Sequence, residues 1–269
     1  MSNIIHFKEN TDVYLEQILK NPSSDLKRPA VIICPGGGYF CVGTTEGAPV
    51  AIRFAEEGYV AFVLNYSILK KASFDMEHPE AFAPTNDLSD AINYLLDNSS
   101  SLGIDPDNIS IAAFSAGGHL ALRYCLNQAI KDTTGTKKIK SLILVYPFLD
   151  YRYKIKKLNH NSNPESEQML KSMSRVIFGK YPADEEQLES FSNHSLLKSL
   201  DKESIKNLVP IFIYHAKNDS MVPYESSEDI IKILDDKGAD YTTYLCDYGE
   251  HANPFYDPSW FDKAFTWMS

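Results

Sequence analysis

Close cysteine pairs and long apolar runs are both missing from this sequence. The few cysteines are scattered without the spacing that binds metals: Cys34, Cys41, Cys125 and Cys246. We therefore expect free thiols in a reducing compartment, no metal site, and no required bridge between Cys34 and Cys41. No run approaches the roughly 18 apolar residues that a membrane-spanning helix needs, and residues 1–10 lack the apolar core of a signal peptide. These absences together predict a cytoplasmic protein.

Positive charge is also scarce. The chain carries 26 Lys and Arg residues against 36 Asp and Glu residues, which gives a formal net charge of −10. Because a negative chain repels nucleic-acid phosphates and anionic lipids, we expect neither nucleic acid nor a membrane as a partner. A composition with 43% hydrophobic and 23% charged residues is typical of a globular enzyme and excludes a disordered or fibrous protein.

Apolar runs typical of buried strands alternate with segments of helical periodicity along the chain. The expected strands are 12–19, 30–34, 59–65, 109–114, 139–146, 208–214 and 241–248. The expected helices are 47–58, 85–98, 116–123, 226–237 and 257–268. This alternation predicts one three-layer α/β/α domain over residues 1–269, with a mostly parallel sheet.

Residues 148–207 interrupt the alternation. This stretch is rich in Lys, Ser, Asn and Glu, lacks strand patterning, and contains short helical pieces at 166–178 and 193–200. Because it has too little apolar material for a core of its own, we expect a small helical, lid-like insertion over the sheet.

A strand-to-helix joint at Ser115 is the strongest single chemical signal. The strand 109–114 leads directly into Ser115, which is followed by a segment of small residues at helical spacing. Small neighbours, here Ala113 and Gly117, let the flanking backbones approach closely enough for so sharp a turn. The pattern predicts a nucleophile elbow with the Ser115 hydroxyl exposed at the carboxyl edge of the sheet. His119 lies one turn further along the same helix, and we expect it to be packed and hydrogen-bonded.

Three glycines, Gly36 to Gly38, follow the strand 30–34. They allow backbone N–H groups to approach a ligand at the end of a strand, where α/β sheets bind their ligands. Because no Lys-Ser or Lys-Thr pair follows, a phosphate-binding loop is disfavoured. The loop instead predicts donors for the oxyanion of a tetrahedral intermediate, together with the N–H of Ala116.

The ends of two later strands carry the residues that a serine nucleophile needs, in the chain order Ser115, Asp219, His251. A serine hydroxyl needs a histidine to accept its proton, and the histidine needs a carboxylate to fix its tautomer. His215 is the second candidate for the base. Asp247 and Glu250 are alternative acids, although we expect both to be solvated.

Taken together, these motifs resemble the α/β-hydrolase superfamily, and within it the small bacterial carboxylesterases and acetyl-xylan-esterase-like enzymes. The resemblance runs over residues 30–267. It rests on an Ile-Ile-Cys-Pro-Gly-Gly-Gly-Tyr loop at 32–39, a Phe-Ser-Ala-Gly-Gly-His-Leu elbow at 114–120, an Asp-x-x-Val-Pro loop at 219–223 and a Gly-x-His turn at 249–251. Two positions depart from the usual pattern, because Ala113 replaces a glycine and Pro35 stands where many lipase-type relatives have His.

The resemblance implies a role for each matching residue. Ser115 is the implied nucleophile, His251 the general base and Asp219 its orienting acid. The N–H groups of Gly37, Gly38 and Ala116 form the implied oxyanion hole. Aromatic residues of the nearby loops are candidates for the substrate pocket or for plain core: Tyr39, Phe40, Phe74 and Phe82.

The sequence therefore predicts a serine hydrolase that cleaves carboxylic esters through an acyl-enzyme, with no metal and no organic cofactor. The resemblance implies a small-molecule ester substrate with a short, acetyl-type acyl group, carried by acetylated sugars or xylo-oligosaccharides. The alternative enzyme is an amidase, peptidase or arylformamidase that uses the same triad. A catalytically silent hydrolase fold used for binding is a further alternative, which is disfavoured because all three triad residues are present.

Overall fold

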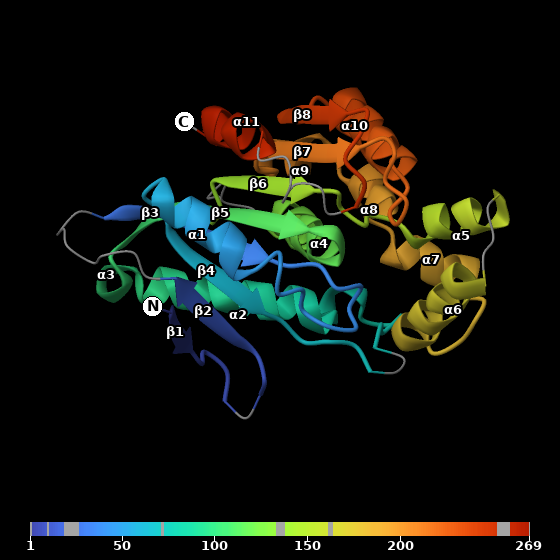
Figure 1. The fold of residues 1–269 in the computed structure, drawn as a ribbon, viewed down its shortest axis with the longest axis horizontal. Helices are drawn as coiled ribbons and strands as arrows, with labels where there is room; N and C mark the ends of the chain where they lie inside the picture. The colour runs from blue at the N-terminus through green and yellow to red at the C-terminus, as the bar shows by residue number, and fades with distance from the viewer. Residues whose placement is uncertain are drawn as a thin grey trace.

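The protein is represented by a computed structural model that describes residues 2–9, 11–18, 27–70, 73–132, 138–160, 164–251 and 259–268. Within these residues the central element is an eight-stranded sheet in the order β1-β2-β4-β3-β5-β6-β7-β8 (Figure 1). The strands are β1 (Ser2–Ile5), β2 (Tyr14–Ile18), β3 (Arg28–Cys34), β4 (Val60–Asn65), β5 (Ile104–Phe114), β6 (Ser141–Val145), β7 (Ile211–Ala216) and β8 (Tyr241–Cys246). The strand β2 pairs antiparallel with β1 and β4, and the other neighbouring strands are parallel. This mostly parallel sheet confirms the predicted α/β class.

The middle strands are continuous apolar runs because both of their faces are covered. Ile32 on β3, Ile111 on β5 and Ile143 on β6 are fully buried. The predicted and observed strands differ by at most three residues at either end, apart from two larger differences. The strand β5 begins at Ile104 rather than at residue 109. The edge strand β1 was not predicted, because three of its four residues are exposed and it shows no apolar pattern.

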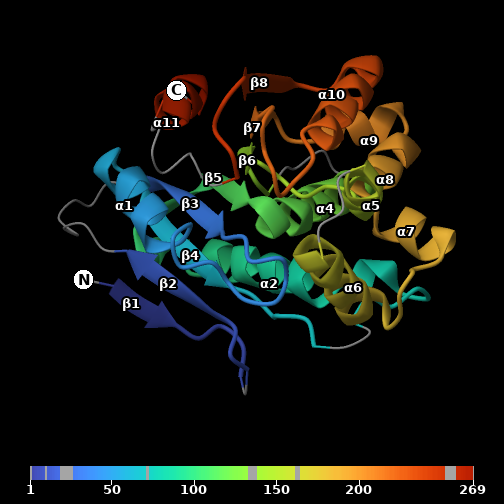
Figure 2. The same cartoon turned by 45° about the vertical axis from the view of Figure 1, so that its right-hand side comes forward.

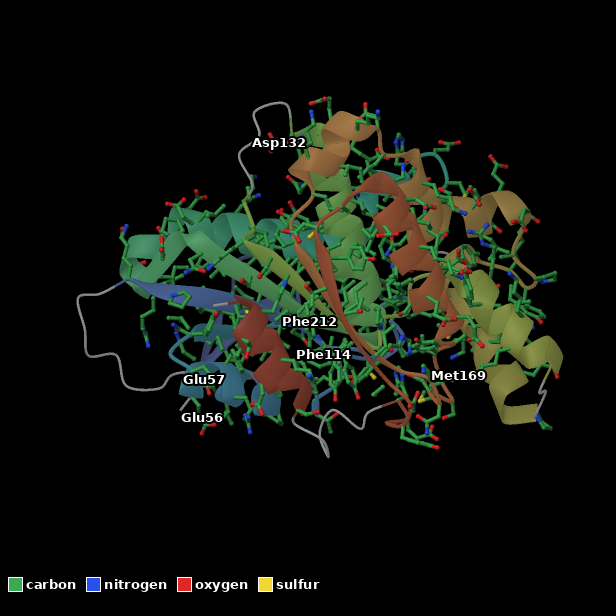
Figure 3. The ribbon with its side chains drawn as sticks, turned by 90° about the horizontal axis from the view of Figure 1, so that it is seen from above. Glu56, Glu57, Phe114, Asp132, Met169 and Phe212 are labelled. Carbon is green, nitrogen blue, oxygen red and sulfur yellow. The ribbon has the colours of Figure 1, made fainter. Side chains whose placement is uncertain are left out.

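Helices cover both faces of the sheet and make three layers (Figure 2). The helices α1 (Ala48–Glu56) and α11 (Ser259–Met268) bury Phe54 and Trp260 against one face. The other face carries α2 (Ala83–Asp97), α4 (Ser115–Lys131), α8 (Asn193–Ser199), α9 (Lys202–Asn207) and α10 (Glu225–Lys237). A 3-10 turn, η1 (Pro79–Ala81), precedes α2, and a short helix, α3 (Ser99–Leu102), precedes β5. In Figure 3 the labelled Phe114 and Phe212 lie in the interior, whereas Glu56 lies at the periphery.

The described part of residues 148–207 contains five helices, which is more than the two pieces that the sequence predicted. They are α5 (Tyr151–His160), α6 (Pro164–Phe178), α7 (Glu185–Phe191), α8 and α9. The helices α5, α7 and α9 were missed because they are short and rich in charge. The apolar side chains of this stretch join the main core rather than a separate one, as Leu170, Phe191 and Leu197 show.

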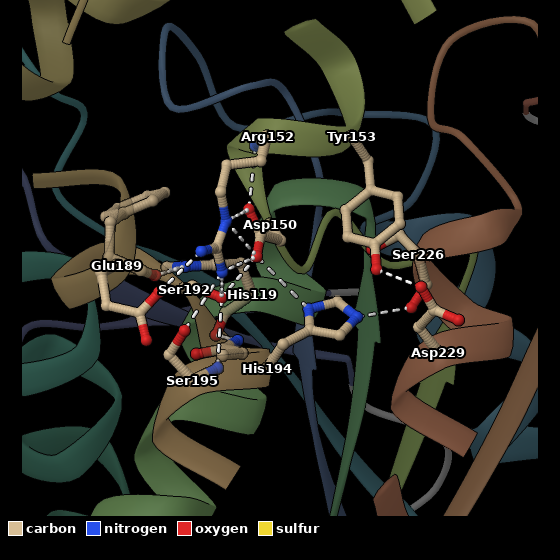
Figure 4. A network of polar contacts seen from close by, with 12 residues as sticks. His119, Asp150, Arg152, Tyr153, Glu189, Ser192, His194, Ser195, Ser226 and Asp229 are labelled. Atoms are coloured by element: carbon tan, nitrogen blue, oxygen red, sulfur yellow. Dashed lines mark hydrogen bonds and ion pairs between the residues drawn. The ribbon is translucent and has the colours of Figure 1, made fainter. Parts of the chain in front are cut away.

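A network of polar contacts fixes the start of α5 against α8 (Figure 4). Nη2 of Arg152 donates to Oδ2 of Asp150 at 2.6 Å and to Oγ of Ser192 at 2.9 Å. His194 contacts the carbonyl oxygen of Ser226 on α10 through Nε2 at 2.7 Å. Burial alone would raise the pKa of Asp150, but the hydrogen bonds from Arg152 and Ser192 outweigh it and lower that pKa below its ordinary value.

A cavity of about 770 Å³ lies beside this network, between α5, α7, α8 and α10. None of the residues predicted to carry chemistry lines it. Across the described ranges, no helix is both long and apolar enough to cross a membrane. The same ranges contain no group of three or more His, Cys, Asp or Glu side chains arranged to hold a metal ion.

Candidate active site

The parallel strands bring the predicted site residues to one edge of the sheet. The glycine loop follows β3, Ser115 follows β5, Asp219 follows β7 and His251 follows β8. Because β3, β5, β6, β7 and β8 all run in the same direction, their carboxyl ends meet at this edge. Residues that lie far apart in the sequence therefore come within contact distance.

Ser115 occupies a strained turn between β5 and α4. Its backbone φ is +48°, a left-handed conformation that a residue with a side chain rarely adopts. The turn brings α4 against the end of β3, where a Cβ atom on Gly117 would lie 2.1 Å from the carbonyl oxygen of Cys34. Only glycine leaves room for α4 to lie this close to the end of β3, which explains why a glycine stands two positions after Ser115.

We expect Gly117→Ala to lower the free energy of unfolding by about 3 kcal/mol or more, because the added methyl group meets rigid backbone atoms. Gly58→Ala is the matched control. Gly58 also has a positive φ, +92°, but a methyl group added there would have no atom within 4 Å. In the control, the free energy of unfolding should fall by only about 1 kcal/mol, because only backbone strain is added. Urea unfolding of both variants measures the difference, and equal losses would contradict the crowding argument.

A row of hydrogen bonds joins the three residues predicted as a triad. Nε2 of His251 lies 3.1 Å from Oγ of Ser115, and Nδ1 of His251 lies 2.8 Å from Oδ2 of Asp219. The other carboxylate oxygen of Asp219 accepts the backbone N–H groups of Met221 and Val222, each at 2.8 Å. This arrangement fixes the carboxylate and turns His251 toward the serine.

His215, the second candidate for the base, lies behind Asp219. Its Nε2 is 3.2 Å from Oδ2 of Asp219 and its Nδ1 is 2.7 Å from Oγ of Ser227. With both ring nitrogens engaged, His215 has none left for Ser115. Burial would raise the pKa of Asp219, but the hydrogen bonds from His215 and His251 outweigh it and hold that pKa below its ordinary value.

His119 is packed and hydrogen-bonded, as the sequence predicted. Its Nδ1 lies 2.7 Å from Oη of Tyr39 and its Nε2 lies 2.9 Å from the carbonyl oxygen of Phe191. Burial, with repulsion from Arg123, lowers the pKa of His119 to about 3. A histidine that stays neutral and fully bonded is a structural residue.

The two alternative acids lie at the surface and pair with other residues. Asp247 pairs with Lys217 at 2.6 Å, and Oε1 of Glu250 accepts Nδ2 of Asn218 at 3.3 Å. Both residues are exposed, as predicted.

The glycine loop borders the same cavity as Ser115. Gly37 and Gly38 have φ values of +120° and +60°, and both line the cavity with Ala116. Within the described residues, the N–H groups of Gly37 and Gly38 donate to no protein acceptor. The N–H of Ala116 belongs to the first turn of α4, where backbone donors have no partner inside the helix. These donors have the chemistry of an oxyanion hole.

Glu46 is a buried residue of the site that the sequence motifs did not reveal. Its Oε2 accepts the N–H of Gly36, and its Oε1 accepts the hydroxyl of Tyr146 at 2.7 Å. The ring of Tyr146 in turn lies 4.4 Å from the ring of His251, centroid to centroid. One carboxylate thus contacts both the glycine loop and the residue packed on the histidine. One feature of the sequence could have pointed to this residue: Glu46 is the only charged residue between Arg28 and Arg53.

We expect Glu46→Leu to lower kcat about 10²-fold with little change in KM, because the glycine loop loses the acceptor that positions it. Glu46→Gln should restore most of the rate, since an amide oxygen can still accept the N–H of Gly36. Steady-state kinetics of the two variants on one ester make the comparison. A Gln variant as slow as the Leu variant would contradict a positioning role through hydrogen bonding.

The cavity at Ser115 has a volume of about 340 Å³. Beyond Ser115, His251 and the glycine loop, α5 and α6 supply Lys154, Met169 and Met173 to its walls. Phe148 comes from the segment before α5, and Met221 and Val222 come from the loop after β7. Thr45 and Glu46 complete its polar side. The insertion at 148–207 thus supplies much of the wall.

The four aromatic residues predicted for the pocket do not line this cavity. Tyr39, Phe74 and Phe82 are buried with Phe191 in a cluster of edge-to-face rings beside α4. Phe40 is partly exposed on the loop that follows the glycines. The pocket prediction is therefore corrected, because these rings gain more burial by packing on one another than by facing a cavity.

Comparison with known proteins identifies related sequences and folds. The BD-FAE family model matches residues 12–234. Endo-1,4-beta-xylanase B of Butyrivibrio fibrisolvens is 29% identical over 238 residues, which are 85% of this chain and 33% of that protein. A probable isoprenylcysteine alpha-carbonyl methylesterase of Oryza sativa subsp. japonica is 26% identical over 251 residues, 92% of this chain and 56% of that protein. The chain thus spans between a third and a little over half of the length of these curated relatives.

A solved structure shares the fold over nearly its whole length. The acetyl ester-xyloside bifunctional hydrolase of Caldicellulosiruptor lactoaceticus superposes with a TM-score of 0.72 at 24% identity, covering 98% of this chain and 94% of that one. The sheet and its covering helices have the α/β-hydrolase arrangement. The fold predicted from the motifs is confirmed.

Proposed function

Since the chain belongs to the BD-FAE family, we propose that it is a serine carboxylesterase that hydrolyses short-chain, acetyl-type esters. The observation that carries the proposal is the row Ser115, His251 and Asp219, hydrogen-bonded in order and opening into a cavity. We further propose acetylated sugars or xylo-oligosaccharides as the natural substrates. The xylanase and the acetyl ester-xyloside hydrolase among the similar proteins support this choice.

In the proposed reaction, Oγ of Ser115 attacks the ester carbonyl while Nε2 of His251 accepts its proton. Asp219 keeps the remaining proton on Nδ1 of His251 and stabilises the imidazolium that forms. The N–H groups of Gly37, Gly38 and Ala116 would bind the oxyanion.

Collapse of this intermediate breaks the bond to the alcohol, which leaves with the proton held on His251. A water molecule then attacks the acyl-enzyme, with His251 again accepting a proton, and the acid is released as Ser115 regains its hydrogen. No metal or organic cofactor takes part in the proposed steps.

The size of the cavity supports a short acyl group. A volume of about 340 Å³ lies near the lower end of the roughly 300–1,000 Å³ usual for ligand pockets. We propose that residues 148–207 act as a lid-like insertion within a single domain, because α5 and α6 close this cavity on one side. A long acyl chain would have to displace their side chains.

The test is hydrolysis of p-nitrophenyl acetate, butyrate and octanoate by the wild type, with Ser115→Ala as the blank. We expect kcat/KM to fall as the acyl chain lengthens. Acetate release from an acetylated xylo-oligosaccharide then tests the substrate class. A folded protein that is inactive on all three p-nitrophenyl esters would contradict the esterase proposal.

A further inference from the structure

One side chain in the wall of the Ser115 cavity has no role in the reaction described above. Lys154 projects from α5 and is the only lysine or arginine among the described residues that line this cavity. It is 9% exposed. The neighbouring walls, including Met173 and Val222, are apolar, so the ammonium group lies in a mostly apolar setting.

The hydrogen-bonding capacity of Lys154 is largely unused. Its ammonium group has three donors, yet it makes one long contact, 3.4 Å to the carbonyl oxygen of Met221, and no ion pair within the described residues. Lys157, one turn further along α5, contrasts with it. Lys157 donates to the carbonyl oxygen of Asp219 at 2.6 Å and does not line the cavity. A buried cation without a paired anion is costly.

The carboxylates nearest to this cavity already have other partners. Both oxygens of Glu46 accept hydrogen bonds, from Gly36 and Tyr146. Asp219 is bonded to its two histidines and to two backbone N–H groups. Burial lowers the pKa of Lys154, while attraction to Asp219 opposes the shift and repulsion from Lys157 adds to it. Among the described residues, the protein therefore offers Lys154 no carboxylate of its own.

We propose that Lys154 determines specificity by pairing with a carboxylate on the substrate, so that the site favours acetyl esters whose alcohol part carries a negative charge. This inference rests on the proposed esterase function. An ammonium–carboxylate hydrogen bond is among the stronger polar contacts in a site shielded from water. In a sugar substrate, an acidic sugar near the acetyl group would provide such a carboxylate.

The experiment compares 4-acetoxybenzoate with phenyl acetate, two acetyl esters that differ by one carboxylate. The quantity compared is the kcat/KM value for 4-acetoxybenzoate divided by that for phenyl acetate, measured for the wild type and for each variant. Because the same two esters are used throughout, any difference in leaving-group reactivity cancels between variants. We expect Lys154→Met to lower this ratio about tenfold or more, and Lys154→Arg to keep it within about threefold of the wild type.

Lys156→Met is the matched control, because it removes the same charge from the same helix. Lys156 lines the other cavity and lies over the ring of Tyr153, so its loss should leave the ratio unchanged. An unchanged ratio in Lys154→Met, or an equal fall in Lys156→Met, would overturn the inference while the esterase proposal stands. If the wild type hydrolyses neither ester, both this inference and the esterase proposal are overturned.

Discussion

Ser115→Ala is expected to lower kcat for ester hydrolysis by about 10⁴-fold to 10⁶-fold while the protein stays folded. Among the described residues, the hydroxyl of Ser115 is the one in contact with Nε2 of His251, so its removal leaves the proposed reaction without a nucleophile. The alanine methyl group fits the same backbone and adds no atom to the turn. Initial rates on p-nitrophenyl acetate measure the effect.

The control is Ser110→Ala, another buried serine, on β5. Its Oγ contacts Oγ of Ser141 at 2.9 Å, and it does not line the cavity. We expect its kcat to stay within about threefold of the wild type. A fluorophosphonate probe, which bonds covalently to an activated serine, should label the wild type and Ser110→Ala but not Ser115→Ala. Labelling of Ser115→Ala would show that another residue is the nucleophile.

Asp219→Asn is expected to lower kcat by about 10³-fold to 10⁴-fold. One carboxylate oxygen contacts both His251 and His215, and the other accepts two backbone N–H groups. An asparagine has only one oxygen, so its NH₂ group must face one of these two sets of partners. If its NH₂ group faces His251, the imidazole keeps its proton on Nε2 and cannot accept one from Ser115. The loss should therefore fall on kcat rather than on KM.

Asp247→Asn is the matched control for this change. Asp247 lies in the same part of the chain as His251, but its side chain pairs with Lys217 at the surface. The control should keep its rate within about twofold, because an exposed ion pair contributes little. Circular dichroism establishes that both variants are folded. A near-normal rate in Asp219→Asn would overturn the assigned acid.

The sequence was sufficient for those features that depend on chain order. Ser115, Asp219 and His251 each follow a strand of a parallel sheet, and the carboxyl ends of such strands meet at one edge whatever the side chains between them. The motif order therefore located residues that the structure places in hydrogen-bond contact. The glycine loop was found for a related reason, since three glycines after a core strand are a strong local signal.

The cavity walls could not be predicted in the same way. Their identity depends on which way the side chains of long loops turn, and local patterns do not determine this. Phe74 and Phe82 pack inward against Phe191. Met169 reaches the cavity from α6, which the sequence predicted, whereas Lys154 reaches it from α5, which the sequence missed. Glu46 was missed because its contact with Tyr146 joins segments that are distant in sequence.

The residues proposed to react and part of the cavity wall lie on different segments of the chain, so substrate preference can change separately from the reaction. The residues proposed to react lie on loops held by the parallel sheet, while one side of the cavity wall belongs to α5 and α6. We expect substitution of their cavity-lining side chains, Lys154, Met169 and Met173, to change which ester fits while Ser115 and His251 stay in place. Exchange of residues 148–178 with those of a relative is accordingly expected to change substrate preference while the proposed triad is retained.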